Sequence, residues 1–357
     1  MSRLQLFKNN PTALFIYGTG TFSRDVLDAI TQHGLKVSGF LDHNPRQPVV
    51  RGSAVTKPNA LSPEMRDSSS VIIGIHNRDA NIAAIISRLN SLGYTHIITP
   101  IDLYDHFEKE LGTRYWLTGR AFYQKFESQI QAVNNLWVDD FSRDIYTRTL
   151  QFRATGDYSL LPKPDWENQY FPLDLPLWKQ PVRFVDCGAY NGDVIQSLSD
   201  HNYRISAVAA FEPDLDNFQT LTNYVLESEI QNTILWPCGV YSSTTQLKFS
   251  TGQGEASAIL DDGTTVVQCV SLDNVIPDFK PTLIKMDIEG AEIEALQGAQ
   301  NILHKYKPGL AISVYHSPEH IWEIPLLIEK ISPNTYQYYL RSHAYNDFDT
   351  VFYAIPI

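Results

Sequence analysis

The stretch Arg183–Gly192, RFVDCGAYNG, decides the fold of this 357-residue chain. It begins as an apolar strand that ends at Asp186. A turn follows, with small and polar residues at Gly188, Asn191 and Gly192. Glycines let the backbone come close to a ligand, and open parallel sheets bind ligands at the carboxyl ends of their strands. The stretch therefore predicts a strand, a ligand-binding turn and a helix of an α/β fold.

A second acidic residue follows the next predicted strand, residues 206–211. Glu212 stands 26 residues after Asp186, which is about one strand–helix unit. An acid at this position accepts hydrogen bonds from both hydroxyls of a ribose. A carboxylate at Asp186 would repel a pyrophosphate, but it suits the ammonium and sulfonium groups of S-adenosylmethionine. The pair favours S-adenosylmethionine; in the alternative, Asp186 only caps a helix and Glu212 lies exposed after its strand.

A third acidic turn follows a later strand, residues 282–286. Asp287 and Glu289 lie in this turn, which would adjoin the first turn in an open sheet. Two histidines follow later strands, His316 after residues 310–315 and His343 after residues 337–341. These four side chains are the candidate general bases.

Four blocks of the C-terminal half resemble, in order, the FkbM family of S-adenosylmethionine-dependent methyltransferases. The blocks are Val185–Ala189, Phe211–Asp214 with Asn217 and Phe218, Ser271–Asp273, and Ile284–Glu292 followed by Ala295–Ala299. The resemblance covers roughly residues 184–357. It implies the seven-stranded Rossmann-like methyltransferase fold and methylation of a hydroxyl, commonly on a sugar or a natural-product scaffold. It also implies that Asp186, the glycine turn and Glu212 hold the cofactor, and that Cys238 and Gly239 lie by the adenine.

Methyl transfer to a hydroxyl requires alignment of the acceptor oxygen and removal of its proton. His316 is the favoured base, because an imidazole with its ordinary pKa near 6.5 works at neutral pH. It could instead be a buried histidine that only binds a neighbouring loop. Asp287 and Glu289 could act as bases or hold a divalent ion. We do not favour the metal, since the spacing shows no third ligand.

The pattern of apolar and polar residues before and after the stretch Arg183–Gly192 predicts that the chain has three parts. Residues 182–357 continue as strands and helices and end in an antiparallel pair of strands. Residues 103–181 are predicted to form an aromatic helical connector followed by a linker with five prolines. The connector would pack the two domains together or form a dimer surface; in the alternative it binds the acceptor, through Tyr170 and Phe171. Residues 1–102 are predicted to be a smaller Rossmann-like domain of alternating strands and helices.

The N-terminal domain carries a weaker nucleotide-binding signal. Gly18 and Gly20 follow its first strand, Arg24 could reach a phosphate, and Asp42 ends the next strand. The unit resembles the nucleotide-binding N-terminal domain of bacterial sugar acetyltransferases of the sialic-acid type. The resemblance implies recognition of the nucleotide part of a sugar donor, although the glycine–histidine pair of that family is missing. The alternative is a domain that serves packing or assembly.

Composition limits the partners and the compartment. With 43% hydrophobic and 19% charged residues, the chain is neither collagen-like nor disordered. A net charge of −12 argues against nucleic acid and anionic membranes as partners. Three widely spaced cysteines predict buried thiols in a cytoplasmic protein. No apolar run is long enough for a membrane span, and the run Ala13–Tyr17 behind residues 1–10 is too short for a signal peptide.

These observations favour a two-domain enzyme that uses S-adenosylmethionine to methylate a hydroxyl of a sugar, a glycoconjugate precursor or a secondary metabolite. The acceptor would be a small molecule, free or nucleotide-linked, and a homo-oligomer is compatible with the pattern. The alternative is a non-catalytic nucleotide-sugar-binding or scaffolding protein with a vestigial methyltransferase fold. An oxidoreductase built on Gly18 and Gly20 is disfavoured, because no second dehydrogenase element follows.

Overall fold

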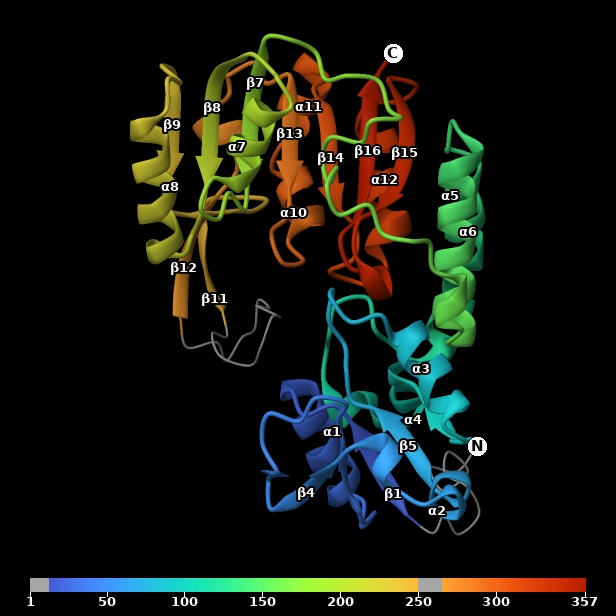
Figure 1. The fold of residues 1–357 in the computed structure, drawn as a ribbon. Helices are drawn as coiled ribbons and strands as arrows, with labels where there is room; N and C mark the ends of the chain where they lie inside the picture. Colours follow the sequence, from blue (N-terminus) through green and yellow to red (C-terminus); the bar gives the residue numbers. More distant parts are fainter. Residues whose placement is uncertain (1–12, 250–264) are drawn as a thin grey trace. The chain divides into compact units, whose positions relative to one another are not determined.

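The computed structural model describes residues 13–249 and 265–357 (Figure 1). The chain forms two compact units that alternate along the sequence. The first contains residues up to Glu127, Thr147–Pro164 and Ala344–Phe348; the second contains Ser128–Tyr146, Asp165–His343 and Asp349–Ile357. Residues 1–12, on which the signal-peptide argument partly rests, lie outside the described residues.

The first unit is built on a six-stranded sheet with the order β3-β4-β2-β1-β5-β6, in which only β3 runs antiparallel to its neighbour. Its strands are β1 (Leu14–Tyr17), β2 (Gly39–Leu41), β3 (Val49–Val50), β4 (Ser53–Thr56), β5 (Ser70–Ile73) and β6 (Ile97–Ile98). Its helices include α1 (Thr21–Gln32), α2 (Pro63–Ser68), α3 (Ile82–Ser91) and α4 (Pro100–Leu111). The predicted Rossmann-like alternation is confirmed; the short β3–β4 hairpin was not predicted.

The second unit is built on a seven-stranded sheet with the order β15-β16-β14-β13-β7-β8-β9. Figure 1 shows its five parallel strands side by side, with β16 and β15 at one edge. The strands are β7 (Val182–Cys187), β8 (Ile205–Phe211), β9 (Thr233–Trp236), β13 (Leu283–Met286), β14 (Gly309–Ser313), β15 (Tyr336–Ser342) and β16 (Thr350–Pro356). The predicted seven-stranded α/β fold and its final antiparallel pair are confirmed.

A small second sheet and seven helices complete this unit among the described residues. The sheet has the order β10-β12-β11, with β10 (Gly239–Val240), β11 (Thr245–Phe249) and β12 (Thr265–Val270). The helices are α5 (Glu127–Asn134), α7 (Asp193–Asp200), α8 (Leu215–Glu227), α9 (Leu272–Val275), α10 (Glu292–Gln297), α11 (Gln300–Tyr306) and α12 (His320–Ile331). The helix α6 (Asp140–Thr155) has residues in both units.

The apolar pattern of residues 291–303 is divided between two helices, α10 and α11. The break lies at Gly298, where a Cβ atom would come within 2.2 Å of the Tyr241 carbonyl oxygen. Asp273 then accepts hydrogen bonds from the amides of Asn301 and Ile302 and holds the start of α11. The backbone contact at Gly298 therefore ends the first helix.

The predicted connector, residues 103–181, does not stand apart from the two units. In the first unit α4 packs on α1, and the ring of Phe107 lies 5.5 Å from that of His33. In the second unit Val138 donates to the Tyr338 carbonyl oxygen at 3.1 Å, and this contact adds the segment to β15. The connector is thus divided between the two units, because its buried side chains pack in the core of one unit or of the other. The five-proline segment after Leu161 is irregular up to β7, as predicted.

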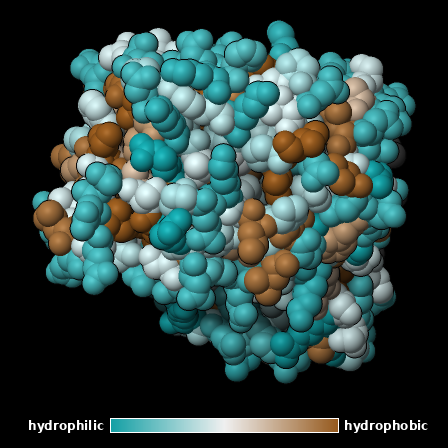
Figure 2. Space-filling view, turned by 90° about the horizontal axis from the view of Figure 1, so that it is seen from above, coloured by the Kyte–Doolittle hydropathy of each residue, from teal (hydrophilic) through white to brown (hydrophobic). Residues whose placement is uncertain are grey.

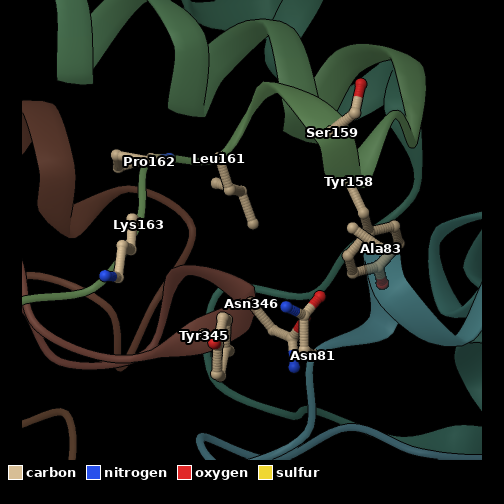
Figure 3. Close-up of a pocket in the computed structure, with 9 residues that line it drawn as sticks. All are labelled: Asn81, Ala83, Tyr158, Ser159, Leu161, Pro162, Lys163, Tyr345 and Asn346. Carbon is tan, nitrogen blue, oxygen red and sulfur yellow. The ribbon is translucent and has the colours of Figure 1, made fainter.

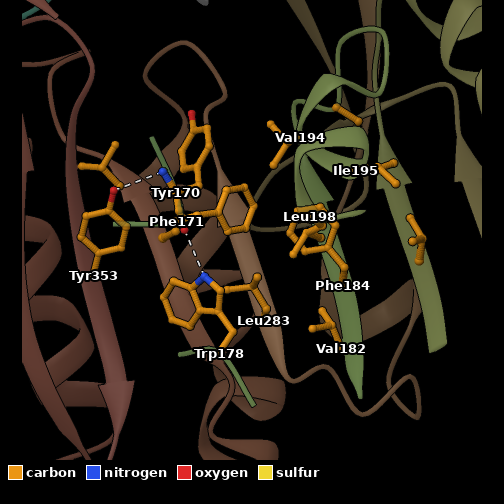
Figure 4. Packing of buried hydrophobic residues seen from close by; sticks show 14 of the residues in the cluster. Tyr170, Phe171, Trp178, Val182, Phe184, Val194, Ile195, Leu198, Leu283 and Tyr353 are labelled. Carbon is orange, nitrogen blue, oxygen red and sulfur yellow. Dashed lines mark hydrogen bonds between the residues drawn. The ribbon is translucent and has the colours of Figure 1, made fainter. Parts of the chain in front are cut away.

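The core of the second unit anchors part of this irregular segment (Figure 4). Tyr170 donates its backbone amide to the Tyr353 hydroxyl at 3.2 Å, and Trp178 Nε1 donates to the Tyr170 carbonyl oxygen at 3.0 Å. Tyr170, Phe171 and Trp178 are buried against β7 and β13 residues. The chain leading into β7 is therefore fixed to the sheet, although it has no regular structure.

The surface shown in Figure 2 is mainly hydrophilic, with hydrophobic side chains in scattered groups. None of the helices in the described part of the chain is both long and apolar enough to cross a membrane.

Candidate cofactor and catalytic site

The turn between β7 and α7 has the backbone conformation that its glycines predict. Gly188 and Gly192 have φ angles of +78° and +91°. A Cβ atom at Gly188 would lie 2.0 Å from the Asp287 carbonyl oxygen, and one at Gly192 would lie 2.9 Å from the Tyr224 ring. The glycines therefore let the turn pack closely on β13 and α8 within the protein itself. Asn191 accepts a hydrogen bond from the Asp193 amide at 3.2 Å and holds the start of α7.

Asp186 lies beneath this turn and not at its surface. Its side chain is fully buried, and Lys285 Nζ lies 3.2 Å from its Oδ1. Lys285 also donates to the carbonyl oxygen of Gly188 at 2.6 Å. Burial raises the pKa of Asp186 to about 6 despite the nearby Lys285. Asp186 pairs with Lys285 and supports the turn from below, and its contact with a cationic cofactor stays a prediction.

Glu212 lies at the end of β8 and contacts the same turn. Its Oε2 accepts the Tyr190 amide at 2.8 Å, and its Oε1 accepts the Asp214 amide at 2.8 Å. The residue is 7% exposed, and burial raises its pKa above the ordinary value. The sequence argument correctly placed this acid beside the glycine turn. Tyr190, in the turn, is 53% exposed.

Cys238 lies between β9 and β10, and Gly239 is the first residue of β10 in the small sheet. Both are on the second unit, and Cys238 is buried with its pKa raised to about 12 by burial. A Cβ atom at Gly239 would lie 3.0 Å from Cys269 Sγ, so a side chain at this position would crowd β12. The three cysteines are free thiols. Proximity of Cys238 and Gly239 to an adenine stays a prediction.

Asp287 and Glu289 stand at the carboxyl end of β13, next to the glycine turn. Tyr170 donates its hydroxyl to Asp287 Oδ2 at 2.8 Å, and burial raises the pKa of Tyr170 well above its usual value, so the hydroxyl keeps its proton. Glu289 has φ +56°, which is unusual for a residue with a side chain. Its side chain is 45% exposed, against 26% for Asp287. Asp287 and Glu289 are thus the accessible carboxylates of the turn.

His316 follows β14 and lies among carboxylates. Its Nδ1 is 2.8 Å from Glu292 Oε1, and its Nε2 is 3.3 Å from Asp287 Oδ1. Burial opposes protonation, but the charges of Glu292, Glu289 and Asp287 outweigh it and raise the pKa of His316 to about 10. The expectation of an ordinary pKa is therefore wrong, because three acids surround this imidazole. The assignment of the base among His316, Asp287 and Glu289 stays a prediction.

Glu292 is the partner that sequence reasoning missed. Its side chain is fully buried, and its Oε1 also accepts the Ile288 amide at 2.9 Å. Burial opposes its ionisation, but His316 and His320 outweigh that effect and hold its pKa well below the usual range. Lys285 was missed as well. The sequence signal for both was a charged residue in an otherwise buried pattern, LIKM for Lys285 and the start of α10 for Glu292.

His343 does not face this group. Its Nδ1 lies 2.7 Å from the Asp165 carbonyl oxygen and its Nε2 lies 2.8 Å from the Tyr353 hydroxyl. The residue is 1% exposed, and burial lowers its pKa. Both ring nitrogens therefore serve the core, and the structure gives His343 no access to an acceptor.

The corresponding turn of the first unit brings Gly18, Gly20 and Asp42 together. Thr19 donates to Asp42 Oδ2 at 3.2 Å, and Asp42 Oδ1 accepts the Asn44 amide at 2.8 Å. A Cβ atom at Gly18 would lie 2.8 Å from Ile75, so an apolar side chain fills the space beside this glycine. Arg24 is exposed on α1. Nucleotide binding at this turn stays a prediction.

The first unit also has a pocket of about 330 Å³ (Figure 3). Its walls come from the start of α3, the segment 158–163 and the segment 345–346. Asn346 Nδ2 donates to the carbonyl oxygens of Asn77 and Ala80 and is thereby occupied. The predicted nucleotide residues Gly18, Gly20, Arg24 and Asp42 do not line this pocket.

In the second unit, the glycine turn, Glu212 and the group formed by Asp287, Glu289 and His316 thus follow the carboxyl ends of neighbouring parallel strands of the seven-stranded sheet. Residues 186–346 match the methyltransferase FkbM domain. This matched segment contains all the residues of the candidate site described in the second unit except Tyr170. No curated protein matches the chain significantly.

One solved structure shares the fold of most of this chain. The crystal structure of the methyltransferase FkbM from Methylobacillus flagellatus KT matches 97% of this chain and 90% of its own, with 23% identity and a TM-score of 0.78. This similarity shows a shared fold. An rRNA methylase from Streptococcus thermophilus and a SAM dependent methyltransferase from Aquifex aeolicus match 49% and 51% of this chain and 86% and 85% of their own, both at 14% identity, with TM-scores of 0.33 and 0.30. The resemblance of the N-terminal domain to sugar acetyltransferases stays a prediction.

Proposed function

We propose that this protein is an S-adenosylmethionine-dependent O-methyltransferase that acts on a hydroxyl of a sugar, a glycoconjugate precursor or a secondary metabolite. The observation that carries the proposal is the contact of Glu212 with the amide of Tyr190 in the glycine turn, at 2.8 Å. An acid placed beside such a turn, in an FkbM methyltransferase domain, favours an adenosine cofactor. The free thiols support a reducing, cytoplasmic setting.

The residues present fit this cofactor. Each carboxylate oxygen of Glu212 accepts one backbone amide and has capacity for a further hydrogen bond, which a ribose hydroxyl would use. The glycine turn, with Asn191, would lie against the methionine part, and Cys238 and Gly239 would lie by the adenine. When bound, the cofactor supplies a methyl group on a positively charged sulfur.

The acceptor would bind beside Asp287 and Glu289. Their exposed carboxylate oxygens are suited to accept the proton that the hydroxyl loses as its oxygen gains the methyl group. Glu289 is the more exposed of the two. His316, with both ring nitrogens facing carboxylates, would hold Asp287 and Glu289 in place and stabilise their charge.

Two measurements test the proposal. Calorimetry with S-adenosylmethionine and S-adenosylhomocysteine should show binding at one site. Transfer of a radiolabelled methyl group, screened first with nucleotide sugars and free sugars, should give a product that resists mild base, since a methyl ether survives where a methyl ester hydrolyses. A folded protein that binds neither cofactor form would support the vestigial scaffold instead.

A base-labile product would contradict O-methylation of a hydroxyl while leaving cofactor use intact. A base-stable product labelled on nitrogen, distinguished by mass spectrometry of the methylated fragment, would contradict it in the same way. Each outcome therefore tests which atom of the acceptor is methylated, independently of whether the protein uses the cofactor.

A further inference from the structure

The buried side chain of Glu292 connects the ends of β13 and β14 in the second unit. Glu292 is the first residue of α10. Its Oε1 accepts the amide of Ile288 at 2.9 Å, and Ile288 stands between Asp287 and Glu289 in the turn after β13. The same oxygen lies 2.8 Å from Nδ1 of His316, which follows β14. One carboxylate oxygen thus contacts both the acidic turn and the imidazole.

The other ring nitrogen of His316 faces the two accessible carboxylates. Its Nε2 lies 3.3 Å from Asp287 Oδ1 and 3.8 Å from Glu289 Oε2. Asp287 is also held from its other side, because its Oδ2 accepts the Tyr170 hydroxyl at 2.8 Å. The imidazole is 1% exposed, and its centroid lies 4.2 Å from that of the Tyr315 ring. Packing and the contact with Glu292 therefore keep Nε2 directed at the acidic turn.

The charges around His316 favour its imidazolium form. Carboxylates only accept hydrogen bonds, so Glu292 at Nδ1 and the acids at Nε2 both favour a ring that carries two protons. Burial opposes this charge, but the three acids outweigh burial and raise the pKa of His316 to about 10. The second oxygen of Glu292 lies 3.3 Å from Nδ1 of His320, at the start of α12. An imidazolium has no lone pair to accept a proton, so His316 is not a base at neutral pH.

We propose that Glu292 is a positioning residue, which fixes His316 as a cation behind Asp287 and Glu289 and leaves the proton transfer to these two carboxylates. Neighbouring carboxylates disfavour each other's ionisation, and a fixed cation opposes that effect. The proton of the acceptor hydroxyl passes to a carboxylate oxygen while the hydroxyl oxygen bonds to the methyl carbon. The bond from that carbon to the cofactor's sulfur breaks, and its electron pair stays on the sulfur. This role in the reaction rests on the proposed function; the arrangement of His316 does not.

Nuclear magnetic resonance of the full-length protein with ¹⁵N-labelled histidine tests the arrangement. The ring-nitrogen shifts report which nitrogens carry a proton, and the signal missing from His316→Asn identifies His316. In the wild type both nitrogens should be protonated near neutral pH. In Glu292→Gln the pKa of His316 should fall by about 1–3, because a neutral amide of the same shape replaces the nearest carboxylate. Glu294→Gln, the same change on the same helix, is the matched control and should titrate as the wild type.

Kinetics test the role of Glu292 in the reaction. With an acceptor found in the methyl-transfer screen, Glu292→Gln should lower kcat by about 10- to 100-fold, since a small misplacement of a reacting group has effects of this order. The KM for the acceptor and the affinity for S-adenosylhomocysteine should stay as in the wild type. A residue that only holds the start of α10 would need its contact with the Ile288 amide alone, and its loss would not move the titration of His316.

A neutral His316 in the wild type near pH 7 overturns the proposal, and this measurement needs no variant to fold. An unchanged titration of His316 in Glu292→Gln overturns it too, as does an equal change in Glu294→Gln. A lowered pKa of His316 with unchanged kcat overturns the role of Glu292 in the reaction. A wild-type protein that transfers no methyl group contradicts the proposed function, whereas the titration of His316 still decides whether Glu292 fixes the imidazole.

Discussion

Two glycine turns in this protein share a local pattern but differ in what lies behind them. In the first unit the turn after β1 carries Gly18, and Asp42 follows the next strand. In the second unit the turn after β7 carries Gly188, and Glu212 follows the next strand. In both, a side-chain oxygen of the acid accepts a hydrogen bond from the turn itself, from Thr19 Oγ1 in the first unit and from the Tyr190 amide in the second.

The two turns differ in the strand that lies next to them, β13 in the second unit and β5 in the first. Behind Gly188, β13 supplies Lys285 and is followed by Asp287, so charged groups meet beneath the turn. Behind Gly18, β5 is followed by Ile75 and by His76, whose pKa burial lowers to about 3. The ring of His76 packs against those of Trp116 and Phe348. A strand–turn–helix pattern therefore becomes a candidate reactive site only where its neighbour brings charge.

The largest expected effect concerns the buried ion pair. Lys285→Met leaves Asp186 buried without its cation and should lower the free energy of unfolding by about 3–5 kcal/mol. The midpoint of thermal unfolding checks this, and S-adenosylhomocysteine binding should fall with it. The double change Asp186→Leu, Lys285→Met should recover most of the stability, because an apolar pair replaces the charges.

Arg153→Met is the matched change in the first unit, where Arg153 and Asp347 form a buried pair at 2.6 Å. It should destabilise by a similar amount, yet leave cofactor affinity of the folded protein unchanged. An equal loss of cofactor affinity in Lys285→Met and Arg153→Met would show that the Asp186–Lys285 pair has no specific role in cofactor binding.

The next effect concerns the glycines. Gly188→Ala places a Cβ atom against backbone at a left-handed φ and should lower the free energy of unfolding by about 2–3 kcal/mol. It should also abolish S-adenosylhomocysteine binding measured by calorimetry. Gly18→Ala meets the side chain of Ile75, which can move, and should leave that binding intact. Retained binding in Gly188→Ala would contradict the close packing of the turn on β13.

Glu212→Ala should weaken S-adenosylhomocysteine binding by about 2 kcal/mol, or roughly 30-fold, through loss of hydrogen bonds to a charged group. Calorimetry measures the change. Asp42→Ala is the counterpart in the first unit and should leave the affinity as it was. An unchanged affinity in Glu212→Ala would remove Glu212 from the cofactor site.

The smallest effect is a pH dependence from His343, away from both turns. Burial lowers its pKa in the folded protein, while in the unfolded chain it titrates near 6.5. Its contribution to stability is therefore complete above about pH 6.5 and is lost as the pH falls below it, by up to about 1.4 kcal/mol per pH unit. His343→Gln should flatten this part of the curve in denaturant titrations between pH 6.5 and 5. The exposed His304→Gln is the control, and equal slopes in both variants would contradict the assignment.

Several features followed from local sequence. The β7 turn, Glu212 and the final antiparallel pair were predictable, because strand alternation, glycine and an acid at fixed spacing are local signals. The broken helix at Gly298 and the division of the aromatic connector were not. Both depend on contacts with residues far along the chain, the Tyr241 carbonyl oxygen in one case and the Tyr338 carbonyl oxygen in the other.

By itself, the sequence determined the order of strands and helices, the two glycine turns and the acids that follow the neighbouring strands. Only the tertiary structure decided what those groups do. It buried Asp186 against Lys285, and it placed His316 and Glu292 beside Asp287. The physical reason is that a charge's pKa and partners depend on which distant residues share its low-dielectric surroundings, and spacing along the chain does not contain that information.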